Sequence, residues 1–222
     1  MQVITWTLPL IAAYLLGSVP VGLLIGLARG IDVRQHGSGN IGAANVMRLL
    51  GFKWGAISLL GDAVKGCLAV LVCILAGTHG GLETTDPFVL NALGAALAIV
   101  GHNWSIFLAF RGGKGIATSL GTCMLLDWRI ALGCFGIWLI AVAVTRYASV
   151  GSILATAAAA TLGLIFLDPW PYKVLFILVA VFAVIRHHAN IRRLVAGTEA
   201  KLGGRSSSQD SERAEEPNAG NA

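Results

Sequence analysis

The feature that most constrains this chain is a long uncharged run at its start: no residue in 1–28 carries a charged side chain. A helix needs about 20 apolar residues to cross a bilayer, and this run exceeds that length. It lacks the positively charged leader and compact apolar stretch of a cleaved signal peptide. The run therefore predicts a retained membrane span, in which Pro9 and Pro20 are tolerable because neighbouring helices can satisfy freed backbone groups.

The rest of the chain repeats this pattern. It is 56% hydrophobic and 12% charged, whereas about a quarter of the residues in soluble domains are charged. The pattern predicts an all-α polytopic membrane protein with seven transmembrane helices. The segment 115–126 is short, because about 12 residues rise only about 18 Å. Tryptophans lie near the segment ends, as expected at a bilayer interface. The six further segments are 54–77, 87–110, 115–126, 130–145, 147–167 and 170–185.

The distribution of Lys and Arg predicts the orientation, because cytoplasmic loops are enriched in these residues. With the N-terminus outside and seven crossings, the outer side receives only Arg129 and Lys173, and Lys65 lies within a span. Six crossings would weaken this bias. The C-terminus is then cytoplasmic, and residues 203–222 form a polar tail that we expect to be disordered, after a single membrane domain, 1–202. The thirteen inner cations are Arg29, Arg34, Arg48, Lys53, Arg111, Lys114, Arg146, Arg186, Arg192, Arg193, Lys201, Arg205 and Arg213.

Three segments on the expected inner face combine cations with hydrogen-bonding side chains: 36–48, 101–118 and 186–199. The first two add glycines, which let a backbone approach a ligand closely, while Lys and Arg offset the charge of an anion. In “RGGKG” the glycines also precede a helix, whose N-terminal amides favour anions. The combination predicts a phosphate site.

Two familiar nucleotide motifs do not apply. “GSGNIG” has the spacing of the dinucleotide fingerprint, but the polar “IDVRQH” precedes it instead of a buried strand. “RGGKG” is not a P-loop, because glycine follows Lys114 where Ser or Thr is required. The net charge of +5 is explained by topology, so no nucleic-acid partner is expected. The four cysteines lie in apolar segments without metal-ligand spacing, which predicts neither a metal site nor a cofactor.

Asp62 and Lys65 are ionisable residues within a predicted span, where such groups are costly and are usually functional or paired. Three positions apart, they share one helix face. A structural ion pair is therefore favoured over direct catalysis.

Taken in order, the three polar segments resemble the three motifs of the PlsY family, the acyl-phosphate:glycerol-3-phosphate acyltransferases of bacterial inner membranes. The resemblance extends to about residue 203 and includes “YLLGSVPVG” and “GDAVKG”. Ala44 and Ser105 stand where Thr and Pro are expected, and Arg111 is an accepted variant of Lys. The resemblance implies acyl transfer from acyl phosphate to the sn-1 hydroxyl of glycerol 3-phosphate, giving 1-acyl-glycerol 3-phosphate (lysophosphatidate) and phosphate, the first step of phospholipid biosynthesis.

The resemblance and the residue chemistry together assign roles. Membrane lipid and the two substrates are the expected partners, with functional coupling to an enzyme that produces acyl phosphate. Glu199 is expected to support the structure, as are Asp62 and Lys65. The expected catalytic residues are Ser38, Arg48, Lys114, His187 and Asn190, and the expected substrate- and phosphate-binding residues are Gly37, Gly39, Asn40, Gly42, Asn45, Gly112, Gly113, Gly115 and Arg193.

Acyl phosphate is a mixed anhydride whose phosphate leaves readily, so the reaction needs positioning and activation of the attacking hydroxyl rather than a covalent nucleophile. Ser38 or Asn190 could orient that hydroxyl. The base could be His187 or a phosphate oxygen of a substrate, with His102 and His188 as reserve candidates.

Two other classes compete with an enzyme. A transporter of a phosphorylated solute usually places its site near the bilayer midplane, between repeated halves. A scaffold for anionic headgroups would use the basic inner face, but would not need His187, Asn190 and the glycine loops together. The placement of all three segments on one face favours the enzyme.

Overall fold

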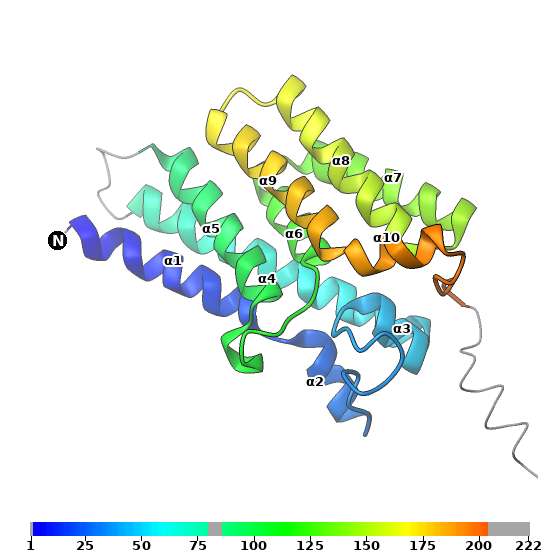
Figure 1. The fold of residues 1–222 in the computed structure, drawn as a ribbon. Helices are drawn as coiled ribbons and strands as arrows, with labels where there is room; N and C mark the ends of the chain where they lie inside the picture. Colours follow the sequence, from blue (N-terminus) through cyan, green and yellow to red (C-terminus); the bar gives the residue numbers. More distant parts are fainter. Residues whose placement is uncertain (1, 80–85, 204–222) are drawn as a thin grey trace, which may run out of the picture.

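The computed structural model describes residues 2–79 and 86–203, and the chain within them is all-helical (Figure 1). Residues 80–85 of the expected outer loop and residues 204–222 of the expected tail lie outside the described part. The helices are α1 Gln2–Ser18, α2 Val21–Ala28, α3 Ala43–Leu50, α4 Phe52–His79, α5 Pro87–Asn103, the 3-10 helix η1 Ile106–Leu108, α6 Ile116–Leu126, α7 Trp128–Thr145, α8 Ala148–Phe166, α9 Trp170–Arg186 and α10 His188–Val195.

Several stretches of the described residues can cross a membrane by length and composition. The pair α9 and α10 meets the same criterion only together, and the two helices are bent by 56°. Helix α6 is apolar but short, as the sequence predicts. The protein is therefore a multi-pass membrane protein, while the seven crossings and the direction of the chain stay predictions. The five qualifying stretches are Trp6–Ala28, Phe52–Thr78, Pro87–Leu108, Trp128–Thr145 and Ala148–Phe166.

The first span contains a break that the sequence analysis did not predict. Pro9 lies inside α1, but Pro20 separates α1 from α2, because proline has no N–H for the helical hydrogen bond and its ring clashes with the preceding turn. Two carbonyls beside the break are bonded by side chains from distant parts of the chain. Ser105 Oγ donates to Ser18 O over 2.6 Å, and Lys65 Nζ donates to Val19 O over 2.7 Å.

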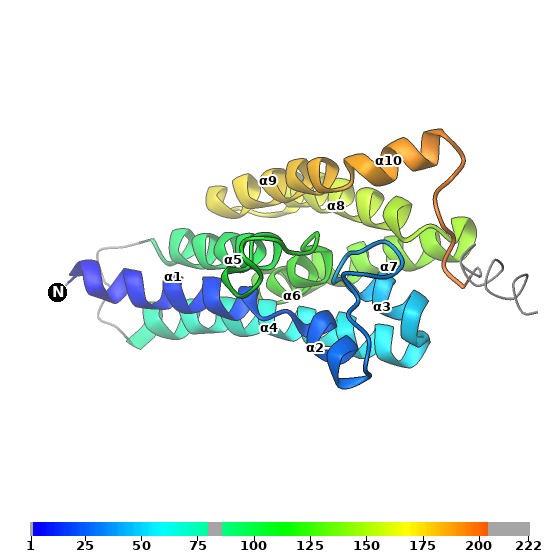
Figure 2. The same ribbon diagram turned by 60° about the horizontal axis from the view of Figure 1, so that its bottom comes forward.

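The long helices form two groups. Helix α1 packs against α4 and α5, while α8 packs against α7 and α9. Helix α6 contacts members of both groups, so it joins them along the middle of the molecule (Figure 2). The short helices α2, α3 and α10 gather at one end, opposite the start of α1 (Figures 1 and 2).

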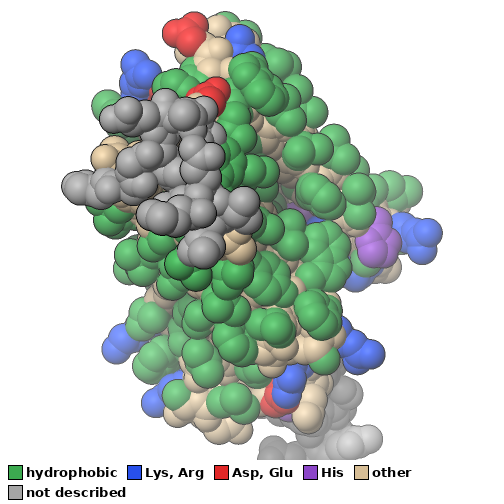
Figure 3. All heavy atoms as spheres, turned by 90° about the vertical axis from the view of Figure 1, so that its left-hand side faces the viewer, with side chains coloured by type: hydrophobic (Ala, Val, Ile, Leu, Met, Phe, Trp, Pro, Cys, Tyr) green, Lys and Arg blue, Asp and Glu red, His purple; other side chains and the backbone are tan. Residues whose placement is uncertain are grey.

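Helices α3 and α10 begin within the first and third polar segments, 36–48 and 186–199, for which the sequence predicts no helix. Each has eight residues, fewer than the window of about 11–18 residues in which an apolar periodicity is recognised in a sequence. At the other end of the bundle, where α1 begins, most of the visible side chains are hydrophobic and those of Lys and Arg lie at the rim (Figure 3).

Candidate active site

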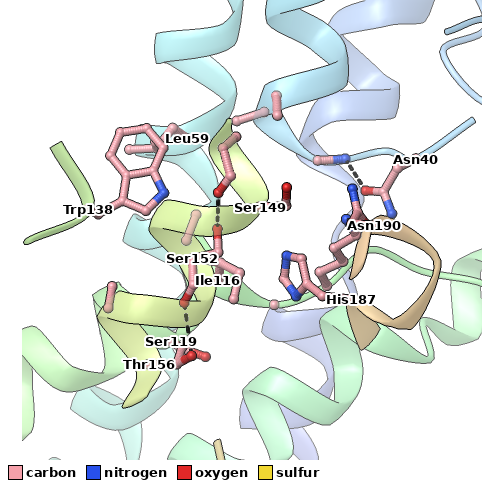
Figure 4. Close-up of a pocket in the computed structure, with 18 of the residues that line it drawn as sticks. Asn40, Leu59, Ile116, Ser119, Trp138, Ser149, Ser152, Thr156, His187 and Asn190 are labelled. Atoms are coloured by element: carbon pink, nitrogen blue, oxygen red, sulfur yellow. Dashed lines mark hydrogen bonds between the residues drawn. The ribbon is translucent and has the colours of Figure 1, made fainter. Parts of the chain in front are cut away.

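A cavity of about 900 Å³ lies between the short helices and helices α6 to α9. Its two ends differ in chemistry. The end near α3 and α10 is lined by Ser38, Arg48, Lys114, His187 and Asn190, and the deeper end by apolar residues of α6 to α9. In Figure 4, Asn40, His187 and Asn190 lie on one side of the cavity, and Trp138, Ser152 and Thr156 lie on the other. The cavity is therefore amphipathic.

Lys114 is held by a chain of hydrogen bonds at the polar end. Its Nζ donates to Asn190 Oδ1, and Asn190 Nδ2 donates to Glu199 Oε1. The same carboxylate accepts bonds from Ser149 Oγ over 2.9 Å and from Arg193 Nε over 2.7 Å. Glu199 thus ties α8 to α10, and both polar atoms of the Asn190 side chain are already engaged.

Positive charge dominates around Lys114. Burial lowers the pKa of Lys114 to about 8, and the nearby Arg193, Arg186 and Arg48 add to the decrease, while Glu199 opposes it. Burial raises the pKa of Glu199, but the hydrogen bonds from Asn190, Arg193 and Ser149 outweigh it and keep that pKa below its ordinary value. With Glu199 satisfied by its partners, the polar end favours a bound anion.

The glycine loop that carries Lys114 packs tightly against the end of α5. A Cβ at Gly113 would come within 2.1 Å of His102 Nε2, so any larger residue would displace the loop. Gly113 N–H donates to His102 O over 3.0 Å. Arg186 donates to Gly112 O over 3.0 Å and, through Nε, to Gly113 O over 3.1 Å. The backbone of these two glycines is fixed by protein partners, and it supports Lys114.

Helix α6 begins directly after this loop. Gly115 is its N-cap and has a φ of +79°, a left-handed conformation that glycine adopts without strain. The first N–H groups of a helix have no intrahelical acceptor, and here they lie beside Lys114. The predicted helix start after “RGGKG” is confirmed.

The loop before α3 is organised by one buried amide. Asn45 Nδ2 donates to Val33 O over 2.9 Å and to His36 O over 3.1 Å, and Asn45 Oδ1 accepts from Ser38 N over 2.9 Å. Ser38 itself lines the cavity. Asn45 therefore shapes the loop, which presents Ser38.

His187 lies at the junction of α9 and α10 and is buried. Its Nδ1 is 2.7 Å from Ala183 O. A carbonyl only accepts, so Nδ1 carries the proton and the neutral ring has its lone pair on Nε2.

Asp62, Lys65 and His102 form a buried polar cluster beneath the glycine loop. Lys65 Nζ is 2.8 Å from Asp62 Oδ1 and 2.9 Å from His102 Nδ1. Thr118 Oγ1 lies 3.2 Å from His102 Nδ1. Lys65 Nζ also donates to Val19 O, whereas its contact with Asp62 Oδ1 is an ion pair without hydrogen-bond geometry. The ion pair that the sequence predicts is present, and its structural role stays a prediction.

Most of the predicted site residues line the cavity. In addition to the five predicted catalytic residues, these are Gly37, Asn40, Gly42, Asn45, Asp62, Gly115, Arg193 and Glu199. Four predicted residues do not line it: Gly39, Gly112, Gly113 and Lys65. The predicted phosphate contact of Gly113 N–H does not fit its bond to His102 O. Arg193 is ion-paired with Glu199, which offsets part of its charge.

Sequence reasoning missed the positions of Arg186 and Ser149. The sequence places Arg186 among the inner cations and at the start of the third polar segment, 186–199, but it does not predict the bonds of Arg186 to the carbonyls of Gly112 and Gly113. Ser149 lies in an apolar helix next to Tyr147, where the sequence gives no comparable signal.

The fold and the cavity define a multi-pass membrane protein suited to a phosphorylated, amphiphilic ligand. Comparison with known proteins narrows this class. The family model described as Glycerol-3-phosphate acyltransferase matches residues 7–197. The chain belongs to this family and is an acyltransferase.

Individual relatives support this family assignment. Glycerol-3-phosphate acyltransferase 2 of Moorella thermoacetica is 46% identical over 90% of this chain and 100% of its own length. The glycerol-3-phosphate acyltransferase of Rubrobacter xylanophilus is 45% identical over 87% of this chain and 93% of its own length. A crystal structure of PlsY, described as an integral membrane glycerol 3-phosphate acyltransferase in its glycerol 3-phosphate form, has a TM-score of 0.80 at 33% identity, over 89% of this chain and 96% of that one. A second PlsY structure, described as the lysophosphatidic acid form, has a TM-score of 0.78 at 33% identity, over 89% of this chain and 95% of that one.

Proposed function

We propose that this acyltransferase moves a fatty acyl group from acyl phosphate to the sn-1 hydroxyl of glycerol 3-phosphate. The products are lysophosphatidate and inorganic phosphate, and the reaction is the first step of phospholipid synthesis. The observation that carries the proposal is the amphipathic cavity, with Lys114 and Arg48 at its polar end and apolar residues of α6 to α9 at the other. This arrangement suits two phosphates placed side by side, with one fatty chain extending away from them.

The cationic side chains at the polar end interact with two phosphates, one on each substrate. Lys114, oriented by Asn190, holds the phosphate of glycerol 3-phosphate, and Arg48 offsets the repulsion between it and the donor phosphate. Because the Asn190 side chain is engaged with Lys114 and Glu199, Ser38 is the better candidate to orient the attacking hydroxyl.

The chemical step then requires one proton transfer. The sn-1 oxygen attacks the acyl carbonyl carbon, the bond from that carbon to the phosphate oxygen breaks, and phosphate leaves with the electron pair. His187 Nε2, whose lone pair is free because Nδ1 donates to Ala183 O, takes the hydroxyl proton. A phosphate oxygen of a substrate is the alternative acceptor.

We further propose that the chain crosses the membrane seven times, with α6 and α9 added to the five long spans. The N-terminus is then outside, and the cationic end of the cavity faces the cytoplasm of a bacterial cell, where glycerol 3-phosphate is dissolved. The donor is an amphiphile and enters from the membrane, which fits functional coupling to an enzyme that produces acyl phosphate.

The test is a reconstituted assay. Purified protein in nanodiscs is given radiolabelled glycerol 3-phosphate with palmitoyl phosphate, palmitoyl-coenzyme A or palmitoyl-acyl carrier protein, and lysophosphatidate and phosphate are quantified. We expect stoichiometric products with palmitoyl phosphate alone. Comparable turnover with either thioester, in preparations free of acyl phosphate, would contradict the proposed donor. His187→Gln keeps a hydrogen-bonding side chain but removes the base, so near-normal turnover in this variant would assign the proton to a substrate phosphate.

A further inference from the structure

The apolar end of the cavity has a defined depth. It is lined by residues from all four surrounding helices: Cys123 of α6, Cys134 of α7, Ala155 and Ala159 of α8, and Leu175 of α9. One face of α8 runs along its full length. Ser149 lies at the polar end, bonded to Glu199, and the lining then continues through Ser152 and Ala155 to Ala159. Ten residues separate Ser149 from Ala159, a rise of about 15 Å.

The cavity ends where α8 meets α9. Gly163 lies one turn beyond Ala159 on the same face, and a Cβ at Gly163 would come within 2.9 Å of the Phe176 ring. Phe176 is 4% exposed and belongs to the cavity lining. Behind it, Tyr172 is buried and contacts Phe88, with 5.5 Å between the ring centroids. Aromatic side chains thus pack between α8 and α9 at this depth.

The part of the wall that α8 contributes is made of small residues as far as Ala159, and the large Phe176 of α9 lies at that depth. Ala155 and Ala159 leave the space that a chain of methylenes can fill, and Phe176 closes it. Each methylene that enters gains apolar burial, but one that reaches the closed end must displace packed side chains, which is unfavourable.

We propose that Ala159 and Phe176 form the stop that sets the longest acyl chain the enzyme uses efficiently. The proposal rests on the proposed acyl-phosphate donor, whose phosphate is held at the polar end and whose terminal methyl group then lies at the stop. A bulkier residue at Ala159 shortens the accepted chain, and a smaller one at Phe176 lengthens it.

The test measures kcat/KM for saturated acyl phosphates from decanoyl to octadecanoyl. For Ala159→Phe we expect the optimum to move to shorter chains, with at least about a tenfold loss for long donors and less than about a twofold change for short ones. Ala155→Phe, about 6 Å nearer the polar end, should shorten the limit further. Phe176→Leu should move it towards longer chains. Ala157→Phe is the matched control, because Ala157 is on the exposed face of the same helix and its profile should not change.

The outcomes separate the two proposals. If wild-type protein used no acyl phosphate of any length, the proposed function would fail and the stop with it. If wild-type protein is active but Ala159→Phe, with normal thermal unfolding, has an unchanged length profile, the chain leaves the cavity sideways into lipid and the stop is refuted. If Ala159→Phe does not fold, the same length profile is measured for Ala159→Leu and Phe176→Leu. Profiles identical to wild type in both variants would refute the proposed stop.

Discussion

Raising the pH above 8 should remove the proton from Lys114 in the free enzyme, and with it most of the activity toward glycerol 3-phosphate. Burial and three nearby arginines lower the pKa of Lys114 to about 8. The ammonium is therefore present below this pH and is lost above it. The neutral amine can no longer form the charge-assisted contact with a phosphate.

The size of the effect follows from the pKa. At pH 9, one unit above it, about a tenth of the molecules keep the proton, so kcat/KM should fall about tenfold from its value near pH 7, equivalent to about 1.4 kcal/mol. The quantity to measure is kcat/KM for glycerol 3-phosphate, because it reports the ionisation of the free enzyme. The substrate does not interfere, since the second ionisation of a phosphate monoester has a pKa near 6.

Lys114→Arg separates this explanation from general alkaline damage. Arginine stays charged throughout the range, so the variant should be slow at every pH, because the planar guanidinium misplaces the charge, but its kcat/KM should not fall between pH 8 and 9.5. Lys53→Arg is the matched control, because Lys53 is exposed and does not line the cavity, and its profile should match wild type. A flat wild-type profile up to pH 9.5, or the same decline in Lys114→Arg, would refute the reasoning.

Three further predictions concern residues around this loop. Arg186→Lys should lower kcat/KM about ten- to a hundredfold in an inserted, folded protein, because a single ammonium cannot bond the carbonyls of two glycines at once; near-normal kinetics would show that the loop holds its shape without it. Glu199→Gln should move the alkaline decline to lower pH, because Glu199 raises the pKa of Lys114, and should lower the thermal unfolding midpoint; an unmoved decline would contradict the electrostatic coupling. In a variant without its four native cysteines, Arg192→Cys should react with an impermeant thiol reagent only from the cytoplasmic side and Arg129→Cys only from the outside; the reverse pattern would overturn the proposed orientation.

The sequence predicted the helices better than the breaks between them. Apolar runs as long as 87–110 are informative because lipid requires continuous helices. Helix α5 covers residues 87–103 of this run. The sequence did not predict the break at Pro20, because Pro9 and Pro20 have similar apolar neighbours and yet Pro9 remains inside α1. The difference lies in Lys65 of α4 and Ser105, the N-cap of η1, whose side chains bond the carbonyls at the break. Such partners are known only once the packing is known.

The polar half of the site was predictable, whereas the apolar half was not. Lys114, His187 and Asn190 stand out because polar residues are rare in this chain, and the structure brings them to one cavity. By contrast, Ala159 faces the cavity and Ala157 does not. Both are alanines in an apolar helix, and lipid and a fatty chain select for the same side chains. Only the packing of α8 against α7 and α9 distinguishes the two faces.

The break at Pro20 also has a consequence for how the protein is made. Synthesis runs from the N-terminal side, so α1 is complete before Ser105, whose hydroxyl bonds the carbonyl of Ser18, exists. The carbonyl of Val19 has a nearer partner, because it also accepts from Val21 N–H over 3.1 Å. Lys65 follows Val19 by 46 residues, and Ser105 follows Ser18 by 87. In hydrocarbon, an unsatisfied carbonyl costs several kcal/mol. The end of α1 thus reaches its final hydrogen bonding only after Ser105 has been translated, and until then water or the insertion machinery must serve the Ser18 carbonyl.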